Sequence, residues 1–196
     1  DATGMGVSLI QSNASGFGCH VVPRGTGVFL HNRGIGFSLE PGHPAEYGPG
    51  RRPPHTLSPA LITRPSGELR TVVGTMGGDA QPQIMLQLLS RLLVGGLTPG
   101  DVLARPRWVI ESRRSDGFDT WRDLSDLAVI VEPEGERWVE GLRARGHDVD
   151  CREVNAGHAH LIDIDTDSTQ HGAAEPRIAT AATLAASPLG RGHLEG

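Results

Sequence analysis

The chain has 196 residues, of which 37% are hydrophobic and 4% aromatic, so it can build one domain or at most two small ones. Its formal net charge of -5 excludes a general attraction to nucleic acid or to anionic lipid. No apolar stretch is long enough to cross a membrane, and no secretory leader pattern is recognisable.

Short strands and loops are expected in the first quarter of the chain. The opening residues 1–4 (DATG) are typical of a turn between two strands. Residues 7–12 (VSLIQS) alternate in the manner of a strand, and residues 25–32 (GTGVFLHN) predict a second short strand with a glycine entry. Residues 33–54 are rich in proline and glycine, which predicts a loop.

A β-hairpin is the clearest element of the next segment. Residues 57–63 and 69–74 are strand-like and flank Arg64-Pro65-Ser66-Gly67, a turn sequence. A helix follows, in which Asp79 is the expected cap, Pro82 fits the first turn and Gly95-Gly96 marks the end. A second, short helix is predicted from Thr98, with Asp101 three residues later in a variant of the capping box.

Strands dominate the prediction for the second half. Residues 107–112 and 127–132 are strand-like, and residues 134–145 predict a helix that ends at a glycine. Residues 148–174 predict two or three further strands. The mixture of hairpins with a few helices predicts a layered α+β domain that spans residues 1–196.

Neither the cysteines nor the histidines indicate a cofactor. Cys19 and Cys151 are far apart, which favours two unpaired thiols, with a single disulfide as the alternative. His158 and His160 would share one face of a strand, but no carboxylate or thiol accompanies them at ligand spacing. We therefore predict no metal and no cofactor.

Several segments of the chain form an ordered set of motifs. They are VSLIQSNASGFG (7–18), VVPRGTGVFLHNR (21–33), PGRRPPHTLSPALI (49–62), VGTMGGDAQPQ (73–83), DVLARPRW (101–108), NAGHAHLI (155–162) and AAEPR (173–177). In this order and at this spacing they resemble the small subunit of gamma-glutamyltranspeptidases. The pattern NRGIGFSLEPGHP, followed by RPPHTLSPAL, is similar to the bacterial branch that includes oxamate amidohydrolase and acylase-like proteins.

This resemblance implies an N-terminal-nucleophile hydrolase with a four-layer αββα sandwich. In the family a precursor cleaves itself, and the new N-terminal Thr becomes the nucleophile, with its own amino group as the base. That Thr is expected about seven residues before Asp1, so the chain would be a small subunit without its nucleophile segment. The implied partners are the large subunit of the same precursor, in a heterodimer or a dimer of heterodimers, and a small-molecule amide.

Three residues match the family's catalytic machinery. Ser12 matches a hydroxyl residue beside the nucleophile; the alternative is a strand hydroxyl that bonds its own backbone. Gly77 and Gly78 match the pair whose N–H groups hold the oxyanion, because glycine allows a close approach to a substrate oxygen. Without the resemblance, Gly-Gly before a helix would indicate an ordinary turn.

The substrate-binding positions depart from those of glutamyl-transferring members. Those members carry Gln or Glu at the position of Arg33 and Asp at the position of Gly36, where they bind the α-amino group of the substrate. A guanidinium beside an ammonium is repulsive and instead suits a carboxylate or another anion. We therefore expect poor binding of glutathione, and we include the neighbouring Asn32 among the candidate binding residues.

A second candidate binding segment differs less from that of glutamyl-transferring members. His55 and Thr56 stand where glutamyl-transferring members carry a Ser-Ser pair that contacts the α-carboxylate, so one hydroxyl is kept. Next to Arg51 and Arg52, the imidazole would complete an anion-binding corner. The alternative is a solvated arginine loop in which His55 packs against a proline.

Three functions remain open from the sequence. The first is an amidohydrolase that forms an acyl-enzyme and usually transfers it to water. The second is a true gamma-glutamyl transferase or hydrolase, in which the large subunit holds the substrate amino group. The third is an inactive fragment with a binding or assembly role. The sequence does not determine the compartment, and a bacterial cytoplasmic location is favoured over an exported one.

Overall fold

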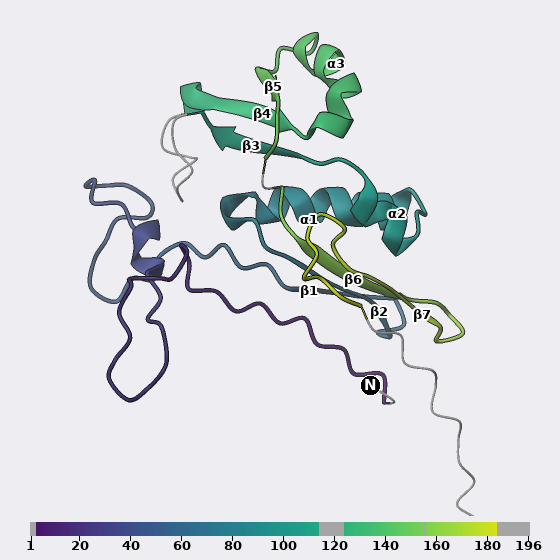
Figure 1. The fold of residues 1–196 in the computed structure, drawn as a ribbon, viewed down its shortest axis with the longest axis horizontal. Helices are drawn as coiled ribbons and strands as arrows, with labels where there is room; N and C mark the ends of the chain where they lie inside the picture. The colour runs from purple at the N-terminus through teal and green to yellow at the C-terminus, as the bar shows by residue number, and fades with distance from the viewer. Residues whose placement is uncertain (1–2, 114–123, 155, 184–196) are drawn as a thin grey trace, which may run out of the picture.

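The computed structural model describes residues 3–113, 124–154 and 156–183. Asp1, Ala2 and Asn155, which belong to segments interpreted above, lie outside the described residues. Two β-sheets lie on opposite sides of a layer of helices, as Figure 1 shows. The combination of mainly antiparallel strands with separate helices confirms the predicted α+β class.

The larger sheet has four antiparallel strands in the order β1-β2-β6-β7. These are β1 (Ala60–Thr63), β2 (Leu69–Thr75), β6 (Ala159–Ile164) and β7 (Gln170–Ala173). The predicted hairpin is therefore confirmed, with β1 shorter than expected. Its turn is closed by a hydrogen bond from Gly67 N–H to the Arg64 carbonyl.

Two helices cover one face of this sheet. The first, α1 (Gln81–Leu89), continues as a π-helical turn (Ser90–Val94), and the second is α2 (Pro99–Ala104). Thr98 caps α2 by accepting a hydrogen bond from Asp101 N–H, as the capping box predicts.

The expected cap of α1 is wrong. Asp79 lies inside a 3-10 turn (Gly78–Ala80), and the N-cap position falls on Ala80, which has no capping side chain. The two glycines before Asp79 start this turn early, so the chain is already helical at the predicted cap. Pro82 lies in the first turn of α1 as predicted.

The core lies between the larger sheet and α1. Val73 and Leu161 point from the sheet toward Ile84 and Leu88 of the helix, and all four side chains are at most 1% exposed. Their alternation along the strands and their spacing along α1 match the periods of strand and helix. Each such side chain stabilises the fold by about 1.5–3 kcal/mol through burial.

The opposite face of the larger sheet remains apolar and accessible. Leu61, Met76 and Ile162 are 49%, 45% and 38% exposed, although they belong to the sheet or directly follow one of its strands. Among the described residues, the N-terminal segment runs along this face and forms an open groove with β2 and β6.

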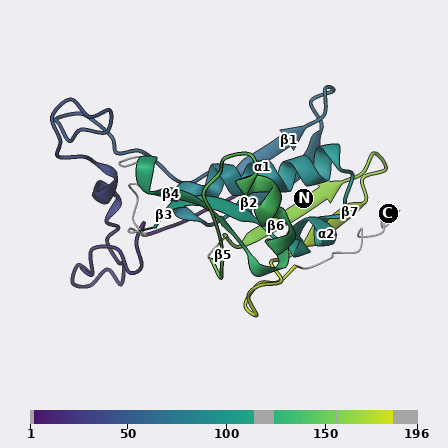
Figure 2. The same ribbon diagram turned by 90° about the horizontal axis from the view of Figure 1, so that it is seen from above.

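The smaller sheet has the order β3-β4-β5 and lies on the side of the helices opposite to the larger sheet (Figure 1), so that it overlaps them in the view from above (Figure 2). It consists of β3 (Trp108–Ser112), β4 (Leu127–Val131) and β5 (Val149–Cys151), with a 3-10 turn (Leu124–Asp126) before β4. The helix predicted over residues 134–145 is a 3-10 turn (Pro133–Trp138) followed by α3 (Val139–Arg143). Two or three strands were expected over residues 148–174, and the structure has β5, β6 and β7 there.

Two glutamine side chains of α1 form hydrogen bonds with the backbone N–H and carbonyl groups at the outer edge of β3. Gln87 donates to the Trp108 carbonyl at 2.8 Å and accepts from the Trp108 N–H at 3.1 Å. One helical turn earlier, Gln83 makes the same pair of contacts with Ile110, at 3.4 and 2.8 Å. The side-chain amides thus replace a neighbouring strand, which keeps this edge from pairing with another chain.

Two predicted strands near the N-terminus are not formed. Residues 7–12 are extended but have no strand partner among the described residues; Ser8 Oγ donates to the Val73 carbonyl at 2.9 Å instead. Residues 25–32 belong to a loose hairpin held by hydrogen bonds such as Leu30 N–H to the Val21 carbonyl. An alternating pattern gives a strand only where a neighbour supplies a continuous row of backbone partners. Among the described residues, residues 7–12 have no such neighbour, and residues 25–32 are bonded to residues 19–21 through the backbone of Leu30 alone.

The predicted loop over residues 33–54 is confirmed, apart from a 3-10 turn (Arg33–Gly36) and one isolated bridge. Cys19 and Cys151 are free and exposed, as expected. No helix in the described part of the chain is long and apolar enough to span a membrane.

Candidate functional site

Gly77 and Gly78 lie directly after β2, at the turn that leads into α1. Their φ angles are 142° and 53°, conformations that residues with a side chain rarely adopt. Neither N–H donates to an acceptor in the described part of the chain. The turn therefore presents two consecutive amide donors, near the positive end of the α1 dipole.

Ser12 reaches this region at the end of the extended N-terminal segment. The segment follows β2 from Ser8, and farther along both Gln11 and Met76 line the same groove. Ser12 is the next residue. Its hydroxyl accepts a hydrogen bond from Ala14 N–H at 2.9 Å, so the local-backbone contact considered in the sequence analysis is present.

The Arg33 side chain connects two of the predicted site residues. Its guanidinium donates to Thr56 Oγ1 at 2.8 Å and to Ser12 Oγ at 3.4 Å. All three residues are partly buried. Hydroxyl groups are neutral acceptors, and these two contacts orient the guanidinium.

Asn32 holds the two halves of this cluster together. Its side-chain oxygen accepts from Ser15 N–H at 3.0 Å, and its own N–H donates to the Asn13 carbonyl at 3.0 Å. These contacts join the loop after Ser12 to the turn that carries Arg33. The amide oxygen of Asn32 is thus used within the protein, which indicates a structural role.

Gly36 is buried against the chain that precedes Thr56. A Cβ atom added to Gly36 would lie 3.3 Å from the Pro54 carbonyl oxygen and 3.5 Å from Pro53 Cβ. The glycine allows this close approach, and an aspartate at this position would need the proline segment to move. The close packing around Gly36 is therefore consistent with the absence of an aspartate carboxylate at this position.

The other anion-binding candidates make contacts of their own. His55 is exposed, and its Nδ1 accepts from Leu57 N–H at 3.2 Å. Arg51 donates to the Pro44 carbonyl at 2.7 Å and lies 3.9 Å from the Glu46 carboxylate. These contacts keep Arg51 on the loop surface, whereas Arg33 points toward Ser12 and Thr56.

A buried glutamine links this cluster to the glycine turn. Gln81, the first residue of α1, is 2% exposed, and its Oε1 accepts from Ser58 N–H at 2.9 Å. Ser58 follows Thr56 by two residues. The strand-like segment that carries Thr56 is thereby attached to the start of the helix that follows Gly77 and Gly78.

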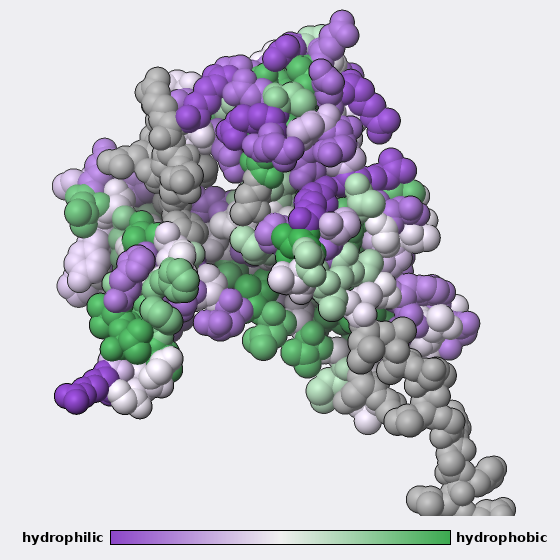
Figure 3. Space-filling model, in the orientation of Figure 1, coloured by the Kyte–Doolittle hydropathy of each residue, from purple (hydrophilic) through white to green (hydrophobic). Residues whose placement is uncertain are grey.

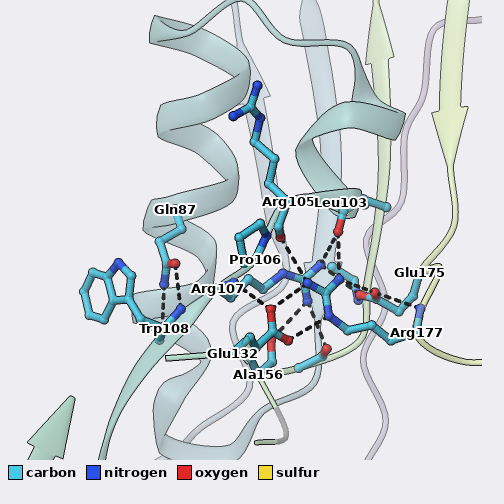
Figure 4. A network of polar contacts seen from close by, with 12 residues as sticks. Gln87, Leu103, Arg105, Pro106, Arg107, Trp108, Glu132, Ala156, Glu175 and Arg177 are labelled. Carbon is cyan, nitrogen blue, oxygen red and sulfur yellow. Dashed lines mark hydrogen bonds and ion pairs between the residues drawn. The ribbon is translucent and has the colours of Figure 1, made fainter. Parts of the chain in front are cut away.

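A buried ionic network was not predicted from the sequence, although three of its members, Arg107, Glu175 and Arg177, fall in the matched segments. It joins Arg107, Glu132, Glu175 and Arg177 (Figure 4). Arg107 and Glu175 have fully buried side chains 2.9 Å apart. The signal in the sequence was Arg107, a charged residue directly before the apolar strand β3. It did not identify Glu175, the partner 68 residues away.

The Glu175 carboxylate stays ionised in this setting. Burial opposes its charge, but a hydrogen bond from Ala159 N–H and the guanidiniums of Arg177 and Arg107 outweigh that effect and lower its pKa. Arg177 in turn donates to both oxygens of Glu132, at 2.8 Å each. The network therefore ties the C-terminal segment to β4, β6 and α2.

Comparisons with known proteins identify the family of this chain. The family model of gamma-glutamyltranspeptidase matches residues 1–185. The oxamate amidohydrolase proenzyme of Klebsiella pneumoniae is 37% identical over 181 residues, which cover 90% of this chain and 33% of that protein. The glutathione hydrolase-like YwrD proenzyme of Bacillus subtilis is 32% identical over 180 residues, with 90% and 33% covered. The chain thus spans about a third of the length of these relatives.

Solved structures give the same assignment. The cephalosporin acylase from Bacillus halodurans has a TM-score of 0.74 at 33% identity, and the match covers 91% of this chain and 32% of that one. A highly active mutant of the gamma-glutamyltranspeptidase from Pseudomonas nitroreducens has a TM-score of 0.78 at 22% identity, with 96% of each chain covered. The fold is that of the N-terminal-nucleophile hydrolases of this group. By the match of the family model over most of its length, the chain belongs to the gamma-glutamyltranspeptidase family.

Proposed function

We propose that this chain carries the oxyanion and substrate-binding residues of an amidohydrolase that acts on small anionic amides. The observation that carries the proposal is the Arg33 guanidinium, held at 2.8 Å from Thr56 Oγ1 and 3.4 Å from Ser12 Oγ. Glutamyl-transferring members bind a substrate ammonium at this position. A fixed cation there repels that ammonium and attracts a carboxylate.

The proposed chemistry begins at a Thr that precedes Asp1 in the precursor. Its hydroxyl oxygen attacks the amide carbonyl carbon, while its α-amino group takes the hydroxyl proton. The carbonyl oxygen becomes negative and accepts hydrogen bonds from the N–H groups of Gly77 and Gly78. The C–N bond then breaks, and the nitrogen leaves with the transferred proton as an amine or ammonia.

The second half of the cycle consumes the ester left on the Thr. A water molecule gives a proton to the α-amino group and attacks the ester carbonyl, and the same two N–H groups stabilise the second oxyanion. Breaking the C–O bond returns the Thr hydroxyl and releases a carboxylic acid. Ser12 matches the family position beside the nucleophile, so its hydroxyl would orient the Thr side chain.

The apolar outer face of the larger sheet supports the proposal that a partner protein binds there. Leu61, Met76 and Ile162 are exposed there, and Val7 and Leu9 on the adjacent segment are 71% and 84% exposed. Figure 3 shows apolar residues gathered on the outlying loops and along the lower side of the molecule. Because relatives of this chain are proenzymes about three times its length, we propose that the large subunit of the same precursor covers these surfaces.

The test uses the full-length precursor and two substrates. We expect self-cleavage into two subunits and release of ammonia from oxamate, the substrate named for one relative, with little release of p-nitroaniline from gamma-glutamyl-p-nitroanilide. A precursor in which the nucleophile Thr is replaced by Ala is the matched control. A folded precursor that neither cleaves itself nor hydrolyses an anionic amide would contradict the proposal.

The second candidate function is gamma-glutamyl hydrolysis or transfer. It is favoured by Thr56, which keeps one hydroxyl where glutamyl enzymes contact the α-carboxylate, and by the glutathione hydrolases among the relatives. In this case the large subunit would bind the substrate ammonium. Rapid p-nitroaniline release with no turnover of oxamate would support this function over the first.

A further inference from the structure

The glycine turn is in direct contact with a second glycine, Gly157. A Cβ atom added to Gly157 would lie 2.4 Å from the Met76 carbonyl oxygen, 2.6 Å from Thr75 Oγ1 and 2.8 Å from Ile84 Cδ1. Gly157 has a φ of 79°. Its Cα would be 3.7 Å from a Cβ added to Gly77. No side chain fits between the two backbones, so their positions are tied to each other.

A backbone hydrogen bond beside Gly157 also joins the two segments. Met76 N–H donates to the His158 carbonyl at 3.2 Å, just beyond the last paired residues of β2 and β6. The carbonyl of Met76 belongs to the same peptide unit as the Gly77 N–H. Any movement of Gly157 against that carbonyl therefore rotates the first of the two amide donors.

A buried ion pair holds Gly157 in place. Arg107 Nη1 donates to the carbonyls of Ala156 and Gly157, at 3.0 and 2.9 Å. Glu175 Oε2 accepts from Ala159 N–H at 2.8 Å and from Arg107 Nη2 at 2.9 Å. Both side chains are fully buried. One guanidinium and one carboxylate thus fix the backbone on both sides of Gly157.

We propose that Gly157, held by Arg107 and Glu175, is a positioning residue that sets the orientation of the amide donors at Gly77 and Gly78. This inference rests on the proposed oxyanion role of that turn. Two successive glycines with positive φ are intrinsically permissive, so the turn needs an external contact to keep its N–H groups aimed at one point. Loss of one such donor lowers kcat about 10²–10³-fold in other enzymes, which shows how strongly orientation matters.

The test compares two glycine-to-alanine variants in the full-length precursor. Gly157→Ala and Gly146→Ala place a side chain at nearly the same φ, 79° and 87°. Only the first meets the glycine turn, because a Cβ at Gly146 has nothing within 4 Å. Rates are measured with oxamate and with gamma-glutamyl-p-nitroanilide, and active-site titration normalises them to the amount of processed enzyme.

We expect kcat of Gly157→Ala to fall at least tenfold with KM within about twofold of the wild type, since the lost interaction forms only in the transition state. Gly146→Ala should keep the wild-type kcat. Equal kcat values for the two variants, or a change in KM alone, would overturn the proposal. If Gly157→Ala does not fold, Arg107→Lys, which keeps the charge but loses the forked donors, replaces it and should show the same loss of kcat.

A second measurement separates this inference from the proposed function. Amide hydrogen exchange should become faster at Met76 and Ala80, whose N–H groups donate to the His158 and Gly77 carbonyls, in Gly157→Ala and stay unchanged there in Gly146→Ala. A wild-type precursor without amidase activity would contradict the proposed function, and exchange would still decide whether Gly157 positions the turn. Unchanged exchange in Gly157→Ala would refute the positioning role, whatever the activity.

Discussion

Arg33→Gln is the substitution that tests substrate selection most directly. It restores the residue type found in glutamyl-transferring members and removes the positive charge between Ser12 and Thr56. A glutamine amide can still donate to a hydroxyl, so the local packing is largely kept. We therefore expect the free energy of unfolding to change by less than about 1 kcal/mol.

The expected effect on binding follows from the geometry of the guanidinium. Arg33 is partly buried and donates to Thr56 Oγ1 at 2.8 Å, so its head group is held in one orientation. A charge-assisted hydrogen bond to a carboxylate in such a setting contributes about 1.5–3 kcal/mol. Its loss should lower kcat/KM for oxamate by about ten- to hundred-fold. Hydrolysis of a gamma-glutamyl anilide should rise, because the repulsion of its ammonium is removed.

The assay is steady-state ammonia release from oxamate by the processed precursor, with p-nitroaniline release measured in parallel. Arg24→Gln is the matched control, since Arg24 is exposed in a turn of the loop hairpin. The control should leave both activities unchanged. Equal loss of both activities in Arg33→Gln, or no loss with oxamate, would refute the assignment of Arg33 to a substrate anion.

Three further substitutions test the packing that supports the site. Gly36→Asp should lower the free energy of unfolding by about 1–3 kcal/mol, measured by chemical denaturation, because the new Cβ lies 3.3 Å from a proline carbonyl; an unchanged midpoint would contradict this. Glu175→Gln leaves Arg107 buried without its anion and should cost about 3–5 kcal/mol. The folded-state pKa of Glu175 is below its ordinary value of 4.5, so the ionised carboxylate stabilises the wild type fully above that pH, and this stability is lost as the pH falls through the lowered pKa. A stability difference between wild type and Glu175→Gln that does not shrink in acid would argue against this ion pair. Gln87→Leu leaves the Trp108 N–H and carbonyl unpaired at the β3 edge and should cost about 1–3 kcal/mol, with more self-association in light scattering; a monomeric variant of wild-type stability would show that the edge needs no cover.

Local pattern determined much of the secondary structure of this protein. The hairpin of β1 and β2 was predictable because its turn residues and strand alternation are local, and α2 was predictable from the cap formed by Thr98 and Asp101. Residues 7–12 and 25–32 were predicted as strands but are not, because strand formation needs backbone partners that local pattern does not supply. Asp79 does not cap α1, because the 3-10 turn that begins at Gly78 already includes it.

The sequence by itself, through its resemblance to a family, also determined which residues to consider: Ser12, Arg33, Thr56 and the glycine pair. Only the tertiary structure decided which of them meet. It placed the Arg33 guanidinium in contact with Ser12 and Thr56. His55 instead accepts a hydrogen bond from the nearby Leu57 N–H. Gly157 packs against the turn formed by Gly77 and Gly78. These contacts join residues far apart in the chain, and their geometry depends on packing and burial that no local pattern encodes.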